Sequence, residues 1–196
     1  MKILSFLFFT NFCFSQIIEI KEITSYTKEA IEATNRHRTS LGLKELEEDP
    51  ILDSACKHHA YYLAYSILYE KNGGGHIETI DIPNFEEKLS TRDRIGHDAN
   101  EIQAVFITSN EDQTKNIYQL FKSSYGFKSF DEFYIESYKK SPEHYKIIIN
   151  QEDVLIGSFT LLIKAKTKFR PELRSYLITV TDSRPMIYEI SRGIYR

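Results

Sequence analysis

The histidines of this chain are the side chains best suited to chemistry, and His144 has the most distinctive local setting. The run Ser141-Pro142-Glu143-His144 predicts a new short helix, because serine caps a helix, proline suits its first position and an acidic residue complements its positive end. That cap would hold His144 on the first helical turn. His59, His76 and His97 lie upstream in separate segments. Whether they converge on His144 decides what chemistry is available.

Two nucleophile arrangements also occur, and we interpret both as structural. Ser141 and His144 have the residue types of a dyad, but a capping serine has its oxygen engaged by backbone N–H groups. Cys56 lies beside His59 on an apolar stripe, whereas a thiolate nucleophile needs exposure and a lowered pKa. We therefore expect Ser141 and Pro142 to form a cap, and Cys56 and His59 to lie in the core. A buried histidine must find a hydrogen-bond partner.

The composition indicates one globular domain preceded by a targeting segment. The chain has 196 residues, 41% hydrophobic and 27% charged. In residues 1–15, Lys2 precedes an apolar run that is too short for a membrane span and suits a secretory signal. Small residues, Cys13 and Ser15, fit a cut before Gln16. The alternatives are a buried N-terminal helix and a lipid anchor on Cys13.

These features predict a secreted or extracytoplasmic protein without nucleic-acid partners. The net charge of −3 argues against nucleic acid. No later segment is apolar for long enough to span a bilayer. Cleavage would leave Cys56 as the only cysteine, so no intramolecular disulfide could form and the core must stabilise the domain.

The helical segments come first in the chain. We expect a lead-in at 16–24, a domain over 25–183 and an extension at 184–196 that could add an edge strand. A helix over 26–41 should end at Gly42, and a second should open at Asp49-Pro50. The second carries the clearest apolar stripe: Leu52, Ala55, Cys56, His59, Ala60, Leu63, Ala64 and Ile67. The run 72–75 should stop it. Further helices are expected at 113–123 and from 130 to the Ser-Pro cap.

Strand patterns dominate the last part of the chain. Residues 154–163 and 176–181 are rich in branched and aromatic side chains, as buried strands are. Their connection is basic, and we favour a solvated hairpin loop over a membrane-facing patch. Its cations are Lys164, Lys166, Lys168, Arg170 and Arg174. Helices first and a strand pair last give an α+β fold.

In this order the segments resemble the CAP, or SCP-like, superfamily of cysteine-rich secretory proteins, antigen 5 and plant pathogenesis-related proteins. The likeness is to its bacterial, disulfide-free branch and covers roughly residues 26–182. It rests on Asn35-Arg36-His37-Arg38, Asp49-Pro50, the run from Tyr138 to His144, and Ile156-Gly157. The resemblance implies a three-layer α-β-α sandwich with a small central antiparallel sheet.

The resemblance also implies a cleft lined by two histidines and two acidic residues, sometimes holding a divalent metal such as zinc. Carried over, the histidines are His76 and His144, which would be the metal ligands. The family's first acid lies in a Gly-Glu-Asn motif, but this chain reads Asp98-Ala99-Asn100-Glu101, so Glu101 follows the asparagine. Glu101 is the nearest candidate for the cleft.

The second acidic position falls on Ser141, and Glu136 and Glu143 lie near it without matching. We therefore expect a non-enzymatic binding or interaction module, whose partner is a protein, a peptide, a lipid or a cell-wall component. The alternative is a metal-dependent hydrolase at the His76/His144 cleft, with a zinc-activated water as nucleophile. Hydrolysis also needs a positioned base, so the test is whether Glu136 or Glu143 faces the histidines.

Overall fold

A central sheet organises the protein. The computed structural model describes residues 16–71, 75–78, 81–82, 85, 100–108, 126–186, 188–189 and 194–195. The strands run antiparallel to their neighbours in the order β1 (Gln16–Glu22), β4 (Leu155–Lys166), β5 (Arg174–Arg184) and β3 (Asn100–Thr108). A two-residue strand, β2 (Glu47–Glu48), pairs in parallel with the start of β4. The two long central strands were predicted from their branched and aromatic residues, which fit a pleated, buried surface.

One helix, α2 (Pro50–Leu68), covers one face of the sheet. Asp49 caps it by accepting a hydrogen bond from the Ile51 N–H at 2.9 Å, and Pro50 occupies its first turn. The predicted stripe is buried against β4 and β5, except that Leu68 replaces Ile67 at its end. The helix also stops before the glycine run, because Glu70 adopts a left-handed φ of 54° and closes the last turn.

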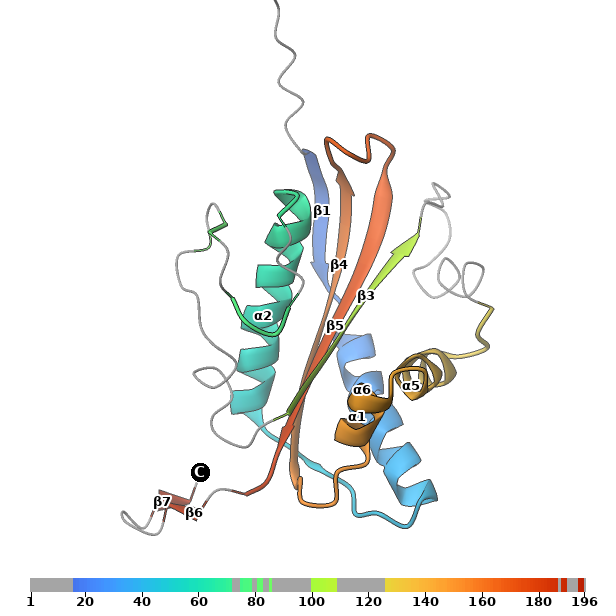
Figure 1. Ribbon diagram of the computed structural model, residues 1–196, viewed down its shortest axis with the longest axis vertical. Coiled ribbons are helices and arrows are strands. Elements are labelled where there is room, and N and C mark those ends of the chain that lie inside the picture. The colour runs from blue at the N-terminus through green and yellow to red at the C-terminus, as the bar shows by residue number, and fades with distance from the viewer. Residues whose placement is uncertain are drawn as a thin grey trace, which may run out of the picture.

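Three of the described helices cover the other face: α1 (Thr24–Ser40), α5 (Phe130–Lys139) and α6 (Pro142–Ile148). Their shared core includes Tyr26 stacked on Phe130, with ring centroids 4.6 Å apart, and reaches Leu162 and Leu177 of the sheet. Figure 1 shows α2 on one side of the strands and α1, α5 and α6 on the other. The predicted three-layer α-β-α sandwich is therefore confirmed.

A glycine sets the spacing between α2 and the sheet. A Cβ atom added to Gly157 of β4 would lie 2.4 Å from the Leu52 Cβ atom of α2. The helix backbone therefore lies directly on the strand at this point. The close contact explains why position 157, in the Ile156-Gly157 pair, is a glycine.

Several sequence expectations differ from the structure. Residues 16–22, expected to be a lead-in, form β1 and pair with β4. The described residues of the tail form β6 (Tyr188–Glu189) and β7 (Ile194–Tyr195), which pair with each other in a separate sheet. The expected helix at 113–123, His97 and the segment 1–15 lie outside the described residues. Among the described helices, none is long and apolar enough to cross a membrane.

Candidate functional site

His76 and Glu101 form the centre of the candidate site. Glu101 is the second residue of β3, opposite Asp182 of β5, and its side chain is 1% exposed. Its Oε1 atom lies 2.7 Å from Nδ1 of His76, whose side chain is 41% exposed. The carboxylate accepts the Nδ1–H hydrogen bond, so Nε2 carries the lone pair in this tautomer of His76. Glu101 thus orients His76 from behind.

His144 lies beside this pair on the first turn of α6. Its ring centroid is 6.2 Å from that of His76, and Tyr138 of α5 packs edge-on against it at 5.9 Å. Burial, and secondarily the charge of His76, lowers the pKa of His144, so its imidazole is neutral at neutral pH. The structure therefore brings His76, Glu101 and His144 together from a loop, a strand and a helix.

The cap that holds His144 differs in one respect from the expectation. Ser141 occupies the N-cap position with extended backbone angles and Pro142 begins the helix, but the Ser141 side chain makes no capping hydrogen bond. The argument that backbone N–H groups engage this hydroxyl was therefore wrong, and Pro142 fixes the start of the helix through its ring. The hydrogen bonds of the described residues still include none between Ser141 and His144.

Behind the site lies a buried cluster that the sequence analysis missed. Nδ1 of His59 lies 2.8 Å from Glu78, and Nε2 of His59 lies 3.1 Å from the Gln103 side-chain oxygen and 3.6 Å from Glu101. His58 contacts the other oxygen of Glu78 at 3.0 Å. The Glu78 side chain is fully buried. His59 is thus a core histidine with partners on both ring nitrogens.

The two other acidic candidates do not reach the histidines. Glu136 pairs with Lys139 at 2.7 Å, and Glu143 pairs with Lys146 at 2.9 Å, both on the surface at i,i+3 spacing. Their side chains are 44% and 82% exposed. Among the described residues, no group of three or more histidine, cysteine or acidic side chains is placed to hold a metal ion. The described cleft therefore contains one carboxylate.

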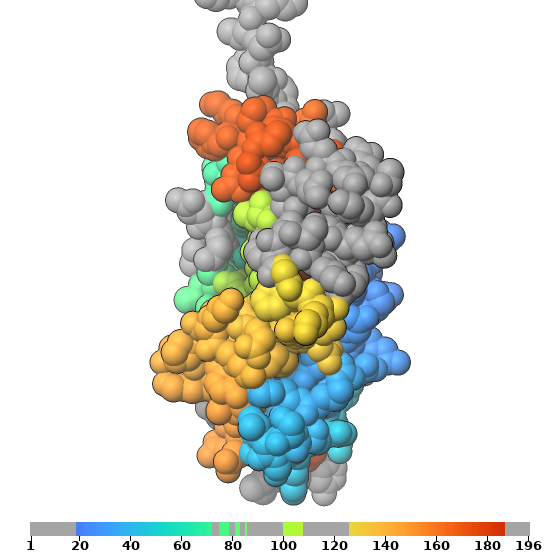
Figure 2. Space-filling view, turned by 90° about the vertical axis from the view of Figure 1, so that its right-hand side faces the viewer, coloured from blue at the N-terminus to red at the C-terminus, as the bar shows by residue number. Residues whose placement is uncertain are grey.

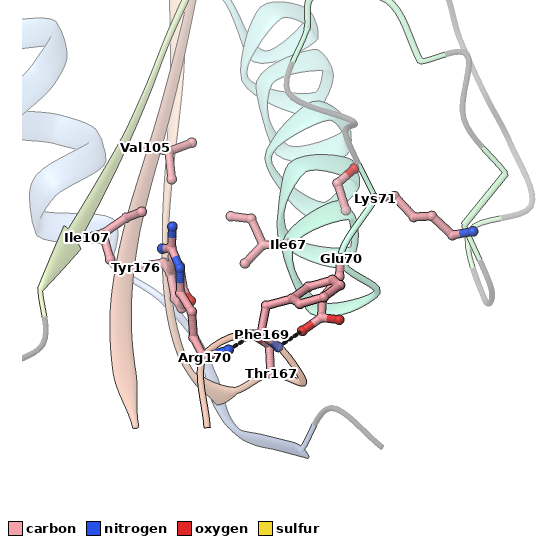
Figure 3. Close-up of a pocket in the computed structure, with 10 residues that line it drawn as sticks. Ile67, Glu70, Lys71, Val105, Ile107, Thr167, Phe169, Arg170 and Tyr176 are labelled. Carbon is pink, nitrogen blue, oxygen red and sulfur yellow. Dashed lines mark hydrogen bonds between the residues drawn. The ribbon is translucent and has the colours of Figure 1, made fainter. Parts of the chain in front are cut away.

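A separate pocket of about 360 Å³ lies between the end of α2, β3 and the hairpin that joins β4 to β5. Figure 3 shows Arg170 on its strand side, with Phe169 next to Ile67 and Glu70 of α2. The sequence analysis did not predict this pocket. Its lining includes none of the site histidines and consists of Ser66, Ile67, Glu70, Lys71, Val105, Ile107, Thr167, Phe169, Arg170 and Tyr176.

The fold is an α-β-α sandwich in which His76, Glu101 and His144 come together from a loop, a strand and a short helix. The chain belongs to the CAP family, the cysteine-rich secretory protein family, whose model matches residues 31–158. A solved structure with the same fold is that of an outer surface protein from Borrelia burgdorferi. It has a TM-score of 0.51 and 18% sequence identity, over 85% of this chain and 99% of that chain. A comparison with curated proteins gave no match.

Proposed function

We propose that this CAP domain is a secreted, non-enzymatic binding module that contacts its ligand through the His76/His144 cleft. The position of Glu101 is the observation that carries this proposal. Its buried carboxylate is hydrogen-bonded to Nδ1 of His76 and faces His59, so it orients a ligand-contacting ring. A carboxylate held in this way is not free to act as a base toward a bound water.

The two histidines suit a ligand that has hydrogen-bonding polar groups. Nε2 of His76 accepts a hydrogen bond, and the neutral imidazole of His144 offers one donor and one acceptor. The Tyr138 ring is buried, and its edge-on contact supports His144 from the core side. A peptide backbone or a cell-wall component supplies hydroxyl or amide groups that match these atoms. Proteins and lipids remain the other partner classes predicted from the sequence.

The described residues fit a metal only in part. Because Glu101 lies on the Nδ1 side of His76, it acts as an outer partner of a metal on Nε2 and not as a ligand. His76 and His144 then supply two protein ligands, whereas catalytic zinc sites use three. We therefore expect weak zinc binding without hydrolysis. The metal-dependent hydrolase remains the second candidate, favoured only by the pairing of the two histidines.

Export rests on the N-terminal segment and on where the domain begins. The proposed cut between Ser15 and Gln16 would release β1 intact, because that strand begins at Gln16. The similar solved structure is titled an outer surface protein, which supports an extracellular place for this chain. A lipid anchor on Cys13 would also place the domain outside the cytoplasm. Sequencing the N-terminus of the exported protein distinguishes the two.

Zinc is the probe for the cleft. We would titrate zinc into residues 16–196 by calorimetry at about pH 7.5, where His144 is neutral. The comparison is with a His76→Ala/His144→Ala variant. A His37→Ala variant is the matched control, because this histidine hydrogen-bonds the Tyr145 hydroxyl at 2.8 Å and is not part of the cleft. We expect weak, saturable binding in the parent and the control and none in the double variant.

A second arm separates the two candidate functions. Zinc-loaded protein is assayed with ester and peptide probes, and we expect no turnover above the double variant. Zinc-dependent turnover in the parent and in His37→Ala, but not in His76→Ala/His144→Ala, would replace the binding module with the hydrolase. Equal zinc binding in all three folded proteins would mean that the two histidines do not form a shared site. Thermal unfolding checks that each variant is folded.

A further inference from the structure

The hairpin joining β4 and β5 exposes an aromatic ring among cations at one end of the molecule. Phe169 is 76% exposed, and its neighbours Lys168 and Arg170 are also exposed, as is Lys166. The Lys168 ammonium lies 5.9 Å from the Phe169 ring centroid. We call residues 166–170 the hairpin tip. Figure 2 shows the hairpin, in orange-red, at one end of the molecule.

The cations of the hairpin differ in whether they form ion pairs. Two other cations of the same hairpin are paired, Lys164 with Glu19 at 2.8 Å and Arg174 with Glu172. The ion pairs among the described residues include none with Lys166, Lys168 or Arg170. Lys166 and Lys168 are therefore exposed cations beside the Phe169 ring, and Arg170 adds a third positive charge from the edge of the pocket.

The backbone of the hairpin tip is held in place. Thr167 and Arg170 exchange backbone hydrogen bonds of 2.9 and 3.2 Å. The Phe169 N–H donates to the carboxylate of Glu70 at 2.7 Å, as Figure 3 shows. Glu70 is itself fixed by the left-handed turn that ends α2. The exposure of Phe169 is thus built into the fold, since several contacts hold this segment where an apolar ring meets water.

The N-terminal segment joins the domain at the same end. Gln16, the first residue of β1, pairs with Lys166 of β4. The apolar run of residues 3–14 is therefore attached within a few residues of the hairpin tip. Figure 1 shows the start of β1 beside the β4–β5 hairpin. A chain that is inserted or anchored through its N-terminus would present this end to the membrane.

The candidate cleft lies at the other end of the sheet. Glu101 is opposite Asp182, whereas Thr108 at the far end of β3 is opposite Ser175, next to the hairpin. At about 3.3 Å per residue, these two ends of β3 are roughly 23 Å apart. A membrane at the hairpin tip therefore leaves His76 and His144 open to ligands.

From these observations we infer that the hairpin tip is a membrane-docking edge for an anionic lipid surface. Phe169 enters the boundary between headgroups and acyl chains, and Lys166, Lys168 and Arg170 attract the anionic headgroups. The inference does not depend on what the histidine cleft binds. It also replaces the interpretation of the basic connection as a merely solvated loop.

The chain lacks tryptophan, which allows a specific test of contact. A Phe169→Trp variant of residues 16–196 carries a single indole, and these residues contain the whole sheet and its core. We would add vesicles of equal parts phosphatidylcholine and phosphatidylglycerol. We expect a blue shift of the emission and protection from acrylamide. A Leu41→Trp variant is the control, since Leu41 is 50% exposed and follows α1 at a distance from the hairpin.

Charge variants test the electrostatic part by vesicle co-sedimentation. Lys168→Gln/Arg170→Gln should bind these vesicles about tenfold more weakly or worse, because each cation near an anionic surface contributes to attraction. Lys44→Gln/Lys128→Gln removes the same charge from exposed positions elsewhere and should bind like the parent. Added salt should release the parent, and pure phosphatidylcholine vesicles should not bind it.

Three results would overturn the inference. One is equal vesicle binding by the two charge variants, which would mean that the vesicles attract the protein's positive charges in general and not the hairpin tip. Another is an indole at position 169 whose emission does not shift while the protein is bound to vesicles. Binding to a soluble polyanion such as polyglutamate, with no binding to anionic vesicles, would also overturn it and identify an acidic protein as the partner.

Discussion

At the scale of single residues, His59 and Glu78 form a fully buried polar pair whose loss would be costly. Both side chains are fully buried, and Nδ1 of His59 lies 2.8 Å from Glu78. The other ring nitrogen faces Gln103 and Glu101. Both ring nitrogens of this buried histidine therefore have a polar partner, and the cluster lies directly behind the candidate site.

Removing one partner of this pair should destabilise the domain strongly. We expect Glu78→Ala to lower the free energy of unfolding by about 3 kcal/mol or more, because His59 and His58 lose a buried carboxylate. The variant His59→Leu/Glu78→Leu should cost less than the sum of its two single variants. Urea unfolding measures both. A change below about 1 kcal/mol in Glu78→Ala would show that the cluster does not support the core.

The residues of the site were only partly predictable from the sequence. His76 and His144 come from a loop and a helix far apart in the chain, so no local spacing relates them. The family resemblance supplied the pairing, and Glu101 was the nearest acidic candidate. Glu78 gave no signal of its own, because its partners lie in a helix some twenty residues earlier. The neighbouring histidines His58 and His59 of α2 were a hint. A histidine that is buried needs a hydrogen-bond partner, and a carboxylate is a suitable one.

At the scale of elements, the contact between α2 and β4 leaves no room for a side chain at position 157. We expect Gly157→Ala to lower the free energy of unfolding by about 1–3 kcal/mol, because the new methyl group would overlap the Leu52 backbone and Cβ. Gly75→Ala is the control, since a Cβ there meets nothing within 4 Å. Thermal or urea unfolding compares them. Equal stability of the two variants would mean that the helix moves away without cost.

The elements that could be predicted are those with local signals. Asp49-Pro50 and a regular apolar stripe identified α2, and dense branched residues identified β4 and β5. β3 was missed because its pairing with β5 joins residues more than sixty positions apart and its faces are covered by different helices. β1 was missed because it directly follows the apolar N-terminal segment. Non-local pairing has no signature in a short window.

At the scale of the whole molecule, β1 is part of the folding unit. It pairs with β4 over its length, and Glu22 bonds Lys57 and Tyr61 of α2 at 2.9 and 3.0 Å. We expect residues 25–196 to unfold at a lower temperature than residues 16–196 and to aggregate, because the edge of β4 becomes open to other chains. Scanning calorimetry and light scattering compare the two. If residues 25–196 and 16–196 unfold at the same temperature, the domain begins near residue 25, as expected from the sequence.

The position of Cys56 affects how the domain withstands an oxidising environment. The thiol is fully buried between α2 and the sheet, and burial, with Asp182 beside it, raises its pKa well above the usual range. In a folded copy this sulfur is closed to oxidants and to other thiols. Once a copy unfolds, the same thiol becomes a reactive group that can couple to another chain. Under oxidising conditions an unfolded copy can therefore form a disulfide with another chain through Cys56, whereas a folded copy cannot.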